Sequence, residues 1–121
     1  AREALAKTHG CIVNITDIQA EKPRQDYAVY VQTKAALKMQ TEALALTYAP
    51  SIRVNAVAPG ATMWPEGENA LSEAAQADVV SNTPLKRHGE PQWVSEAVLS
   101  LVLNQFITGQ TLRVDGGRSL V

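Results

Sequence analysis

The chain has 121 residues, 45% of them apolar, with 11 Lys and Arg against 12 Asp and Glu. This composition is typical of a globular domain, and a near-neutral charge without a basic run argues against nucleic acid or an anionic membrane surface as the main partner. No apolar stretch approaches the roughly 20 residues that span a bilayer. A single cysteine cannot form an internal disulfide, and with two histidines there is little material for a zinc site. We therefore expect a cytoplasmic protein without a bound metal.

The first half of the chain predicts a helix end, a strand and a long helix. Residues 1–7 resemble the last turns of a helix, and residues 11–15 form a β-rich run that ends at polar residues, which predicts a strand. Asp26 can cap a helix over residues 27–48, because large and apolar side chains recur there at helical spacing.

The second half predicts two further strands with two helices between them. Residues 52–57 favour a strand, and the alanine-rich residues 70–81 favour a helix. Pro91 suits the first turn of another helix, and residues 110–114 alternate as a third strand. The apolar face of the last helix is assigned to the core and consists of Val94, Ala97, Val98, Leu101 and Val102.

This order of elements predicts an α/β fold. Long helical connections between strands demand a parallel sheet, and three parallel strands rarely stand alone. The first strand would leave its backbone groups open along one edge, which such sheets normally pair with a further strand. We therefore expect half of a doubly wound parallel sheet, with three strands and about three helices.

Tyr30 and Lys34 are the first candidate catalytic pair. They lie four residues apart on the predicted helix, so their side chains share one face. A neighbouring ammonium stabilises a phenolate, which brings a tyrosine closer to the range in which it can exchange protons at neutral pH. The alternative is a half-buried tyrosine beside a lysine whose stem covers apolar surface.

Asp17 gives this pair a context, because it follows the end of the first strand. Ligands of parallel sheets bind at the carboxyl ends of the strands, so Asp17, the Pro59-Gly60 turn and the turn at residues 115–117 should open on one rim. Taken alone, Asp17 fits an ordinary loop or capping residue better than a catalytic one. Beside Tyr30 and Lys34 it becomes a candidate acid or orienting group.

Four motifs in order resemble the carboxyl half of a short-chain dehydrogenase/reductase. They are the strand at residues 11–15, Tyr30-Val31-Gln32-Thr33-Lys34, Arg53-Val54-Asn55-Ala56-Val57-Ala58-Pro59-Gly60, and Ile107-Thr108-Gly109 followed by Val114-Asp115-Gly116-Gly117. The resemblance covers nearly the whole chain. It implies that residues 1–121 are the C-terminal half of a single Rossmann-type domain, with a nicotinamide cofactor and a homotetrameric assembly.

One residue differs from the pattern of most members of that family and points to a particular group within it. Most members carry a serine thirteen residues before the tyrosine, and here this position is Asp17. Thr16 is a poor substitute, because adjacent residues of an extended chain face opposite ways. Aspartate at this place resembles the pteridine reductases, as do residues 14–17 and 117–121. That likeness implies NADPH as the cofactor and a pterin or folate as the substrate.

The same likeness implies a role for each candidate site residue. Tyr30 would deliver a proton with the help of Asp17, and Lys34 would hold the ribose hydroxyls of the cofactor. Further cofactor contacts would come from Pro59, Gly60 and Thr62, although Thr62 could also reach the substrate. The residues implied to line the pterin pocket with Asp17 and Tyr30 are Gln19, Tyr27, Met63, Trp64 and Pro65. Trp64 could equally be a lid residue that packs on the following helix.

Three functions stay open at this point. They are reduction of a pterin or dihydrofolate, reduction of a ketone or enoyl substrate by another member of the family, and a non-catalytic assembly role. The glycine-rich phosphate loop and the family's catalytic asparagine are expected upstream of Ala1, so the sequence predicts no cofactor binding by these residues alone. His9 and His88 are assigned no role, and Trp93 is assigned to packing or a subunit contact.

Overall fold

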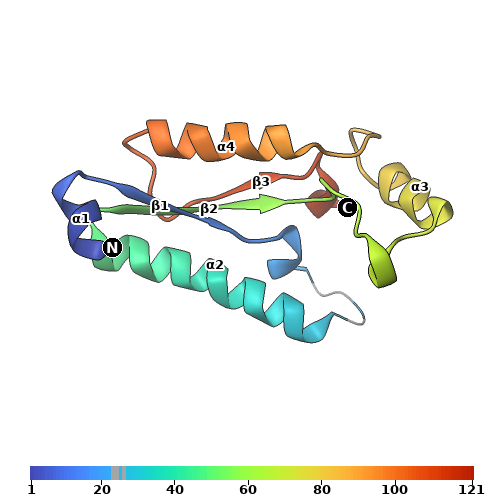
Figure 1. Ribbon diagram of the computed structural model, residues 1–121, viewed down its shortest axis with the longest axis horizontal. Coiled ribbons are helices and arrows are strands. Elements are labelled where there is room, and N and C mark those ends of the chain that lie inside the picture. Colours follow the sequence, from blue (N-terminus) through green and yellow to red (C-terminus); the bar gives the residue numbers. More distant parts are fainter. Residues whose placement is uncertain (23–24, 26) are drawn as a thin grey trace.

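The computed structural model describes residues 1–22, 25 and 27–121, and it has helices on both faces of a three-stranded sheet (Figure 1). Helix α4 covers one face and helix α2 the other. The predicted α/β fold of Rossmann type is confirmed. The elements are α1 (Arg2–Lys7), β1 (Cys11–Ile15), the 3-10 turn η1 (Ile18–Ala20), α2 (Ala28–Tyr48), β2 (Arg53–Pro59), the 3-10 turn η2 (Gly67–Asn69), α3 (Glu73–Ser81), α4 (Pro91–Leu103), β3 (Thr111–Val114) and the 3-10 turn η3 (Arg118–Leu120).

The strands lie in the order β1-β2-β3 and are all parallel. Cys11 pairs with Arg53, and Ala56 pairs with Thr111. The central strand β2 is covered by α2 and α4, so both of its faces are shielded from solvent and Val54 is fully buried. All three strands therefore end at the same side of the molecule, which becomes a rim for the residues that follow them.

Helix α2 packs on the sheet through residues at helical spacing. Thr41 and Ala45 are its buried members. The Thr41 hydroxyl donates to the carbonyl of Leu37 at 2.8 Å and accepts from Nδ2 of Asn14 on β1 at 2.9 Å. This pair of hydrogen bonds satisfies a buried hydroxyl and ties α2 to β1. Among the described residues, no helix is long and apolar enough to cross a membrane.

Two polar side chains of β2 hold the crossover to β3. The guanidinium group of Arg53 donates to the carbonyls of Leu101 and Val102 at 2.8 Å, which are orphaned acceptors at the end of α4. The side chain of Asn55 is fully buried, and its oxygen accepts from the backbone amide of Gln110 at 3.0 Å. These contacts fix where α4 ends and β3 begins.

Several predicted boundaries differ from the structure. Strand β2 continues to Pro59 because the amide of Gly60 still pairs with the Val114 carbonyl of β3 at 3.0 Å. Helix α3 begins at Glu73, since the Ser72 side chain caps it by accepting from the amide of Ala75. The boundary of β3 also differs, because this strand begins one residue later than predicted.

The helices agree with the prediction apart from details. The described residues form four α-helices, close to the expected number of about three, and the 3-10 turns are too short to leave a periodic pattern. Val102 was assigned to the core but is 42% exposed, because the buried stripe of α4 ends at Leu101. Asp26, the predicted cap of α2, lies outside the described residues. Tyr27 occupies the N-cap position there.

Candidate active site

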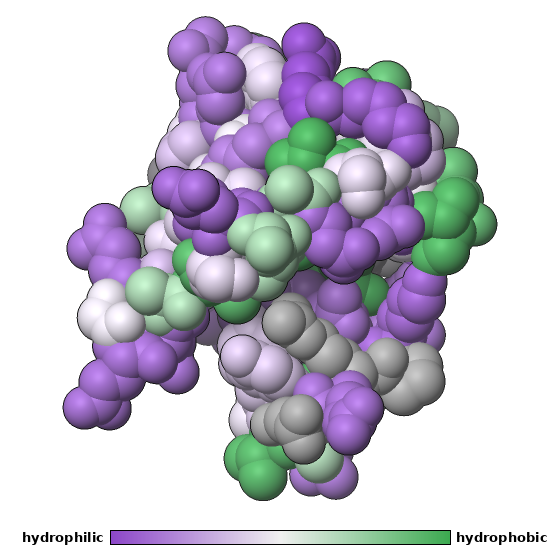
Figure 2. Space-filling model, turned by 90° about the vertical axis from the view of Figure 1, so that its right-hand side faces the viewer, coloured by the Kyte–Doolittle hydropathy of each residue, from purple (hydrophilic) through white to green (hydrophobic). Residues whose placement is uncertain are grey.

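The candidate site lies at the rim where the strands end. Figure 2 shows this end of the molecule, where hydrophilic residues predominate and small hydrophobic patches lie between them. The last residue of β1 is Ile15. Asp17 lies two residues later, just before η1. The rim is the place at which ligands of parallel α/β sheets bind.

The Asp17 carboxylate joins the turn after β1 to helix α2. The hydroxyl of Tyr30 donates to its Oδ2 at 2.7 Å. Its other oxygen, Oδ1, accepts from the backbone amide of Gln19 at 2.7 Å and so caps η1. The capping role and the candidate catalytic role are thus carried by the same side chain, one oxygen each.

Lys34 lies one helical turn beyond Tyr30 and on the same side of α2. Its Nζ is 5.7 Å from the centroid of the Tyr30 ring and donates to the carbonyl of Ile15 at 3.0 Å. This distance places a positive charge near the face of the Tyr30 ring. An ammonium carries three N–H donors, and the Ile15 carbonyl takes one, so the group suits a neighbouring diol such as a ribose.

Thr16, the residue before Asp17, faces into the protein. Its side chain is 3% exposed, and the hydroxyl donates to the carbonyl of Val57 on β2 at 3.1 Å. The alternation of an extended chain therefore sends Thr16 inward and Asp17 to the rim. The interpretation that Thr16 cannot replace the usual serine is supported by this geometry.

The predicted cofactor contacts lie on the same rim, after β2. A Cβ at Gly60 would lie 2.9 Å from the Cα of Asp115, so the close approach of these two turns requires glycine whether or not a ligand is present. Thr62 lies beside Gly89, where an added Cβ would come within 2.9 Å of the Thr62 methyl group. The groups at this rim are the Lys34 ammonium, the Tyr30 phenol and the turn at Gly60. Such a set fits the ribose of a nicotinamide cofactor.

Asp115 stabilises the turn that follows β3. Burial of its carboxyl group raises the pKa, but hydrogen bonds from Ser119 and Gly117 outweigh burial and hold the pKa below the ordinary value. Oδ1 accepts from the amide of Gly117 at 2.9 Å, and Oδ2 accepts from the amide of Ser119 at 2.8 Å. Asp115 is therefore an ionised structural group.

The residues predicted to line a pterin pocket fall into two groups. Tyr27 and Gln19 join the Asp17 site: the Tyr27 ring meets the Tyr30 ring edge-on, with centroids 6.4 Å apart. Met63, Trp64 and Pro65 lie on the loop after β2. Met63 is 72% exposed, and the Trp64 ring packs on the His88 imidazole with centroids 4.1 Å apart.

His88 was assigned no role, and the structure gives it one. Besides its contact with Trp64, its Nε2 is buried and has no hydrogen-bond partner among the described residues. The stack links the loop after β2 to the loop before α4. A histidine beside a glycine gives no sign of such a contact in the sequence, because its partner lies 24 positions away.

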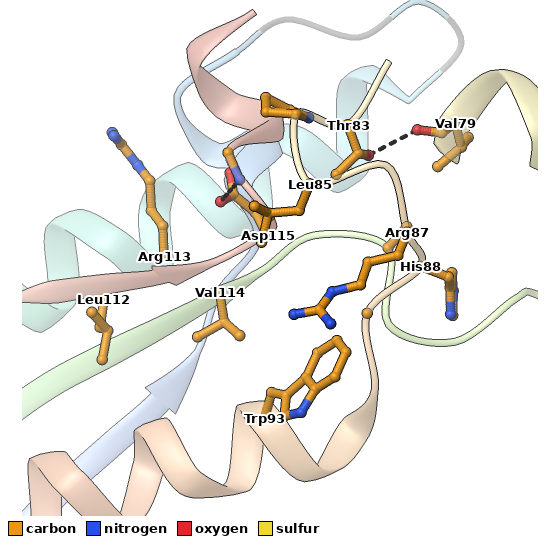
Figure 3. Close-up of a pocket in the computed structure, with 15 residues that line it drawn as sticks. Val79, Thr83, Leu85, Arg87, His88, Trp93, Leu112, Arg113, Val114 and Asp115 are labelled. Carbon is orange, nitrogen blue, oxygen red and sulfur yellow. Dashed lines mark hydrogen bonds between the residues drawn. The ribbon is translucent and has the colours of Figure 1, made fainter. Parts of the chain in front are cut away.

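Trp93 was assigned to packing or a subunit contact, but it lines a pocket of about 550 Å³ between β3 and the loop before α4 (Figure 3). The Arg87 guanidinium lies over its ring, 4.7 Å from the centroid. Leu112 and Val114 point into the same space. This pocket opens on the β3 side of the sheet, next to the loop that carries His88.

Glu21 lies just after η1, and sequence reasoning did not predict its contacts. Its carboxylate pairs with Lys38 of α2 and with Arg113 of β3. The hydrogen bond from Arg113 lowers the pKa of Glu21, and the contact with Lys38 acts in the same direction. The partners are far apart in the chain, so no local spacing could have predicted the contact.

Comparison with known proteins identifies relatives along almost the whole chain. Residues 1–119 match the family described as enoyl-(acyl carrier protein) reductase. The chain is 37% identical to glucose 1-dehydrogenase 2 of Bacillus subtilis over 114 residues, 92% of this chain and 44% of that protein. It is 33% identical to dihydromonapterin reductase of Klebsiella pneumoniae over 124 residues, 99% of this chain and 50% of that protein.

Solved structures agree with this comparison. An oxidoreductase from Haemophilus influenza with bound NAD superimposes with a TM-score of 0.84 at 31% identity, covering 98% of this chain and 46% of that one. The chain thus spans about half the length of the relatives it matches. Their names include enzymes acting on different substrates.

Proposed function

Because the chain belongs to the short-chain dehydrogenase/reductase family, we propose that it supplies the catalytic half of an NADPH-dependent reductase of a pterin or dihydrofolate. The observation that carries the proposal is the 2.7 Å hydrogen bond between the Tyr30 hydroxyl and Asp17. Lys34 completes the set, one helical turn away. On this proposal the dinucleotide-binding half of the domain precedes these residues.

The proposed reaction reduces a C=N bond to CH–NH. When bound, the reduced nicotinamide supplies the hydride that forms the new C–H bond and is itself oxidised. Tyr30 delivers the proton that forms the N–H bond, and the charge left on its oxygen is stabilised by Lys34. Asp17 shares its hydrogen bond with Tyr30 and so keeps the phenolic oxygen in place, and solvent returns the proton.

A carboxylate at position 17 favours a nitrogen heterocycle as substrate. It can accept hydrogen bonds from an exocyclic amine or a protonated ring nitrogen, which a serine hydroxyl does less well. The dihydromonapterin reductase among the relatives is consistent with such a substrate. Tyr27 and Gln19, beside Asp17, would contact the same ring, and Trp64 would cover it from the loop after β2.

Lys34 would hold the ribose of the cofactor, with Pro59, Gly60 and Thr62 along the next strand end. The preference for NADPH over NADH rests on the pteridine-reductase likeness. We also propose a homotetramer, in which β3 pairs with its counterpart in a neighbouring chain. In support of this, β3 is an outer strand of the sheet, and no described strand pairs with its free edge.

A second candidate is reduction of a ketone or enoyl substrate, or the reverse oxidation of an alcohol. The family description and the glucose dehydrogenase among the relatives favour it. Tyr30 and Lys34 would act in the same way, with the proton going to a carbonyl oxygen for a ketone and to carbon for an enoyl group. Asp17 would then occupy the position of the usual serine without selecting the substrate.

The test compares substrates on the protein at its full natural length. Purified protein is mixed with NADPH and either dihydrobiopterin, dihydrofolate or a panel of ketones and enoyl thioesters, and cofactor oxidation is followed by absorbance. We expect turnover of a pterin or dihydrofolate. Turnover of a ketone or enoyl thioester alone would transfer the function to the second candidate. Oxidation of cofactor in no mixture would favour a non-catalytic assembly role.

A further inference from the structure

The end of β1 and the chain that follows it are attached to α2 at three successive helical turns. Tyr30 holds Asp17, and Lys34 holds the carbonyl of Ile15. One turn further, Nζ of Lys38 lies 3.3 Å from Oε1 of Glu21. The first two contacts belong to the candidate active site, whereas the third lies outside it.

Glu21 joins three elements at this third attachment. Lys38 reaches it from α2, and Arg113 reaches its other carboxylate oxygen from β3. Figure 3 shows Arg113 pointing to the opposite side of β3 from Leu112 and Val114, which line the pocket. Two cations on separate elements therefore fix one carboxylate from two directions.

The segment between Asp17 and Glu21 is too short and too constrained to absorb a movement of either end. Asp17 accepts the Ala20 amide at 3.0 Å through its carbonyl and the Gln19 amide at 2.7 Å through its side chain. Ile18, in the middle of this single 3-10 turn, is buried. Because one hydrogen-bonded turn joins the two residues, we expect a displacement of Glu21 to reach the carboxylate of Asp17.

We propose that Glu21 is a positioning residue for the active site: held by Arg113 and Lys38, it fixes the η1 turn so that the Asp17 carboxylate meets the Tyr30 hydroxyl. Glu21 acts through Asp17 and touches no substrate. The inference rests on the proposed function, because it assigns Glu21 to the step in which Asp17 and Tyr30 act together.

A double-mutant cycle tests the proposal in the protein at its full natural length. Glu21→Gln keeps the size of the side chain and removes its charge, and it is made alone and together with Asp17→Asn. The matched control is Glu42→Gln, because Glu42 pairs with the same Lys38 at 2.7 Å but belongs to α2. The rate constant kcat and the KM values for cofactor and substrate are measured for each variant.

We expect Glu21→Gln to lower kcat about fivefold, or about 1 kcal/mol of activation free energy, and to leave the KM for the cofactor within about twofold. Glu42→Gln should keep the wild-type kcat. In the Asp17→Asn background, Glu21→Gln should cause no further loss, since the group through which it acts has already been changed.

The cycle separates this inference from the proposed function. If Asp17→Asn lowers kcat but Glu21→Gln leaves it unchanged or lowers it equally in both backgrounds, the positioning role is overturned and the function stands. If neither Asp17→Asn nor Tyr30→Phe lowers kcat, the proposed function fails, and the positioning role fails with it.

A second measurement does not depend on turnover. The amide hydrogen of Gln19, which donates to Asp17, reports directly on the η1 turn. We expect its exchange with solvent to accelerate at least about threefold in Glu21→Gln and to stay at the wild-type rate in Glu42→Gln. Equal exchange rates in Glu21→Gln and the wild type would overturn the proposal whatever the substrate of the enzyme.

Discussion

The Tyr30 hydroxyl and the Asp17 carboxylate meet at 2.7 Å, although they come from different elements and lie 13 positions apart. Tyr30 is 42% exposed, so the pair can be reached from solvent. The opposite oxygen of the same carboxylate is bound by the turn that follows β1. Tyr30 thus has a hydrogen-bond partner whose orientation is set by the backbone.

Replacing Tyr30 by Phe should abolish most of the catalysis. The change removes the proton donor and leaves a ring of the same shape, so kcat should fall by about two to four orders of magnitude while the thermal midpoint changes little. Steady-state kinetics and circular dichroism measure the two quantities. Tyr48→Phe, at the far end of the same helix, serves as the control, and equal activity in both variants would contradict a catalytic Tyr30.

Two substitutions of Asp17 should separate its two roles. Asp17→Asn keeps an oxygen that can accept from Gln19, so it should lower kcat about a hundredfold with little loss of stability. Asp17→Ala also removes the cap of η1 and should cost about 1 kcal/mol more in the free energy of unfolding. Kinetics and denaturant unfolding of both variants test this, and indistinguishable stabilities would refute the capping role.

Thr41 should be more important for stability than its size suggests. Thr41→Val keeps the shape of this fully buried side chain but leaves the half-buried Asn14 amide without its acceptor, and should destabilise the protein by about 1–3 kcal/mol. Thr47→Val, at an exposed position of the same helix, is the control and should change the unfolding free energy far less. Similar denaturation midpoints for the two variants would argue against this account.

Asp115 should contribute to the loss of stability in acid. Its pKa in the folded protein lies below the ordinary value near 4, so its contribution is fully present above about pH 4 and is lost as the pH falls through the folded pKa. Asp115→Asn should therefore unfold more easily than the wild type at pH 7 but show a smaller drop in stability between pH 5 and about pH 3. Parallel pH profiles for the two proteins would contradict this assignment.

The proposed tetramer predicts a sedimentation coefficient for the intact protein that corresponds to four chains. Leu112→Glu should lower the order of assembly, because a charge on an open edge strand opposes strand pairing. Analytical ultracentrifugation of both proteins is the measurement. A monomer of the intact wild-type protein would refute the tetramer.

The strands could be predicted from the sequence because their apolar runs are bounded by glycine, proline and polar residues. The run at residues 11–15 has the same bounds in the structure. The rule that parallel strands end on one rim placed Asp17 at this rim, and the rule that residues four apart share a helix face paired Tyr30 with Lys34. These are local or topological facts, which a sequence carries. The partnership of Asp17 with Tyr30 was implied by the family resemblance.

The rest of the site depends on contacts that no local pattern records. Glu21 meets Arg113 across 92 positions, and the orientation of both side chains follows from the twist and packing of the whole sheet. The stack of Trp64 on His88 joins two loops whose paths are set by α3 between them. Such contacts become visible only once the elements are placed in three dimensions.

The four-residue interval between Tyr30, Lys34 and Lys38 makes the function of α2 sensitive to helical phase. Each added residue turns the rest of an α-helix by about 100°, so a single insertion between Tyr30 and Lys34 would carry the ammonium to another side of the helix while every residue type was retained. Deletions and insertions in this stretch should therefore be far more damaging than substitutions on its outer surface. The relative placement of these three side chains therefore depends on the number of residues between them as well as on their identity.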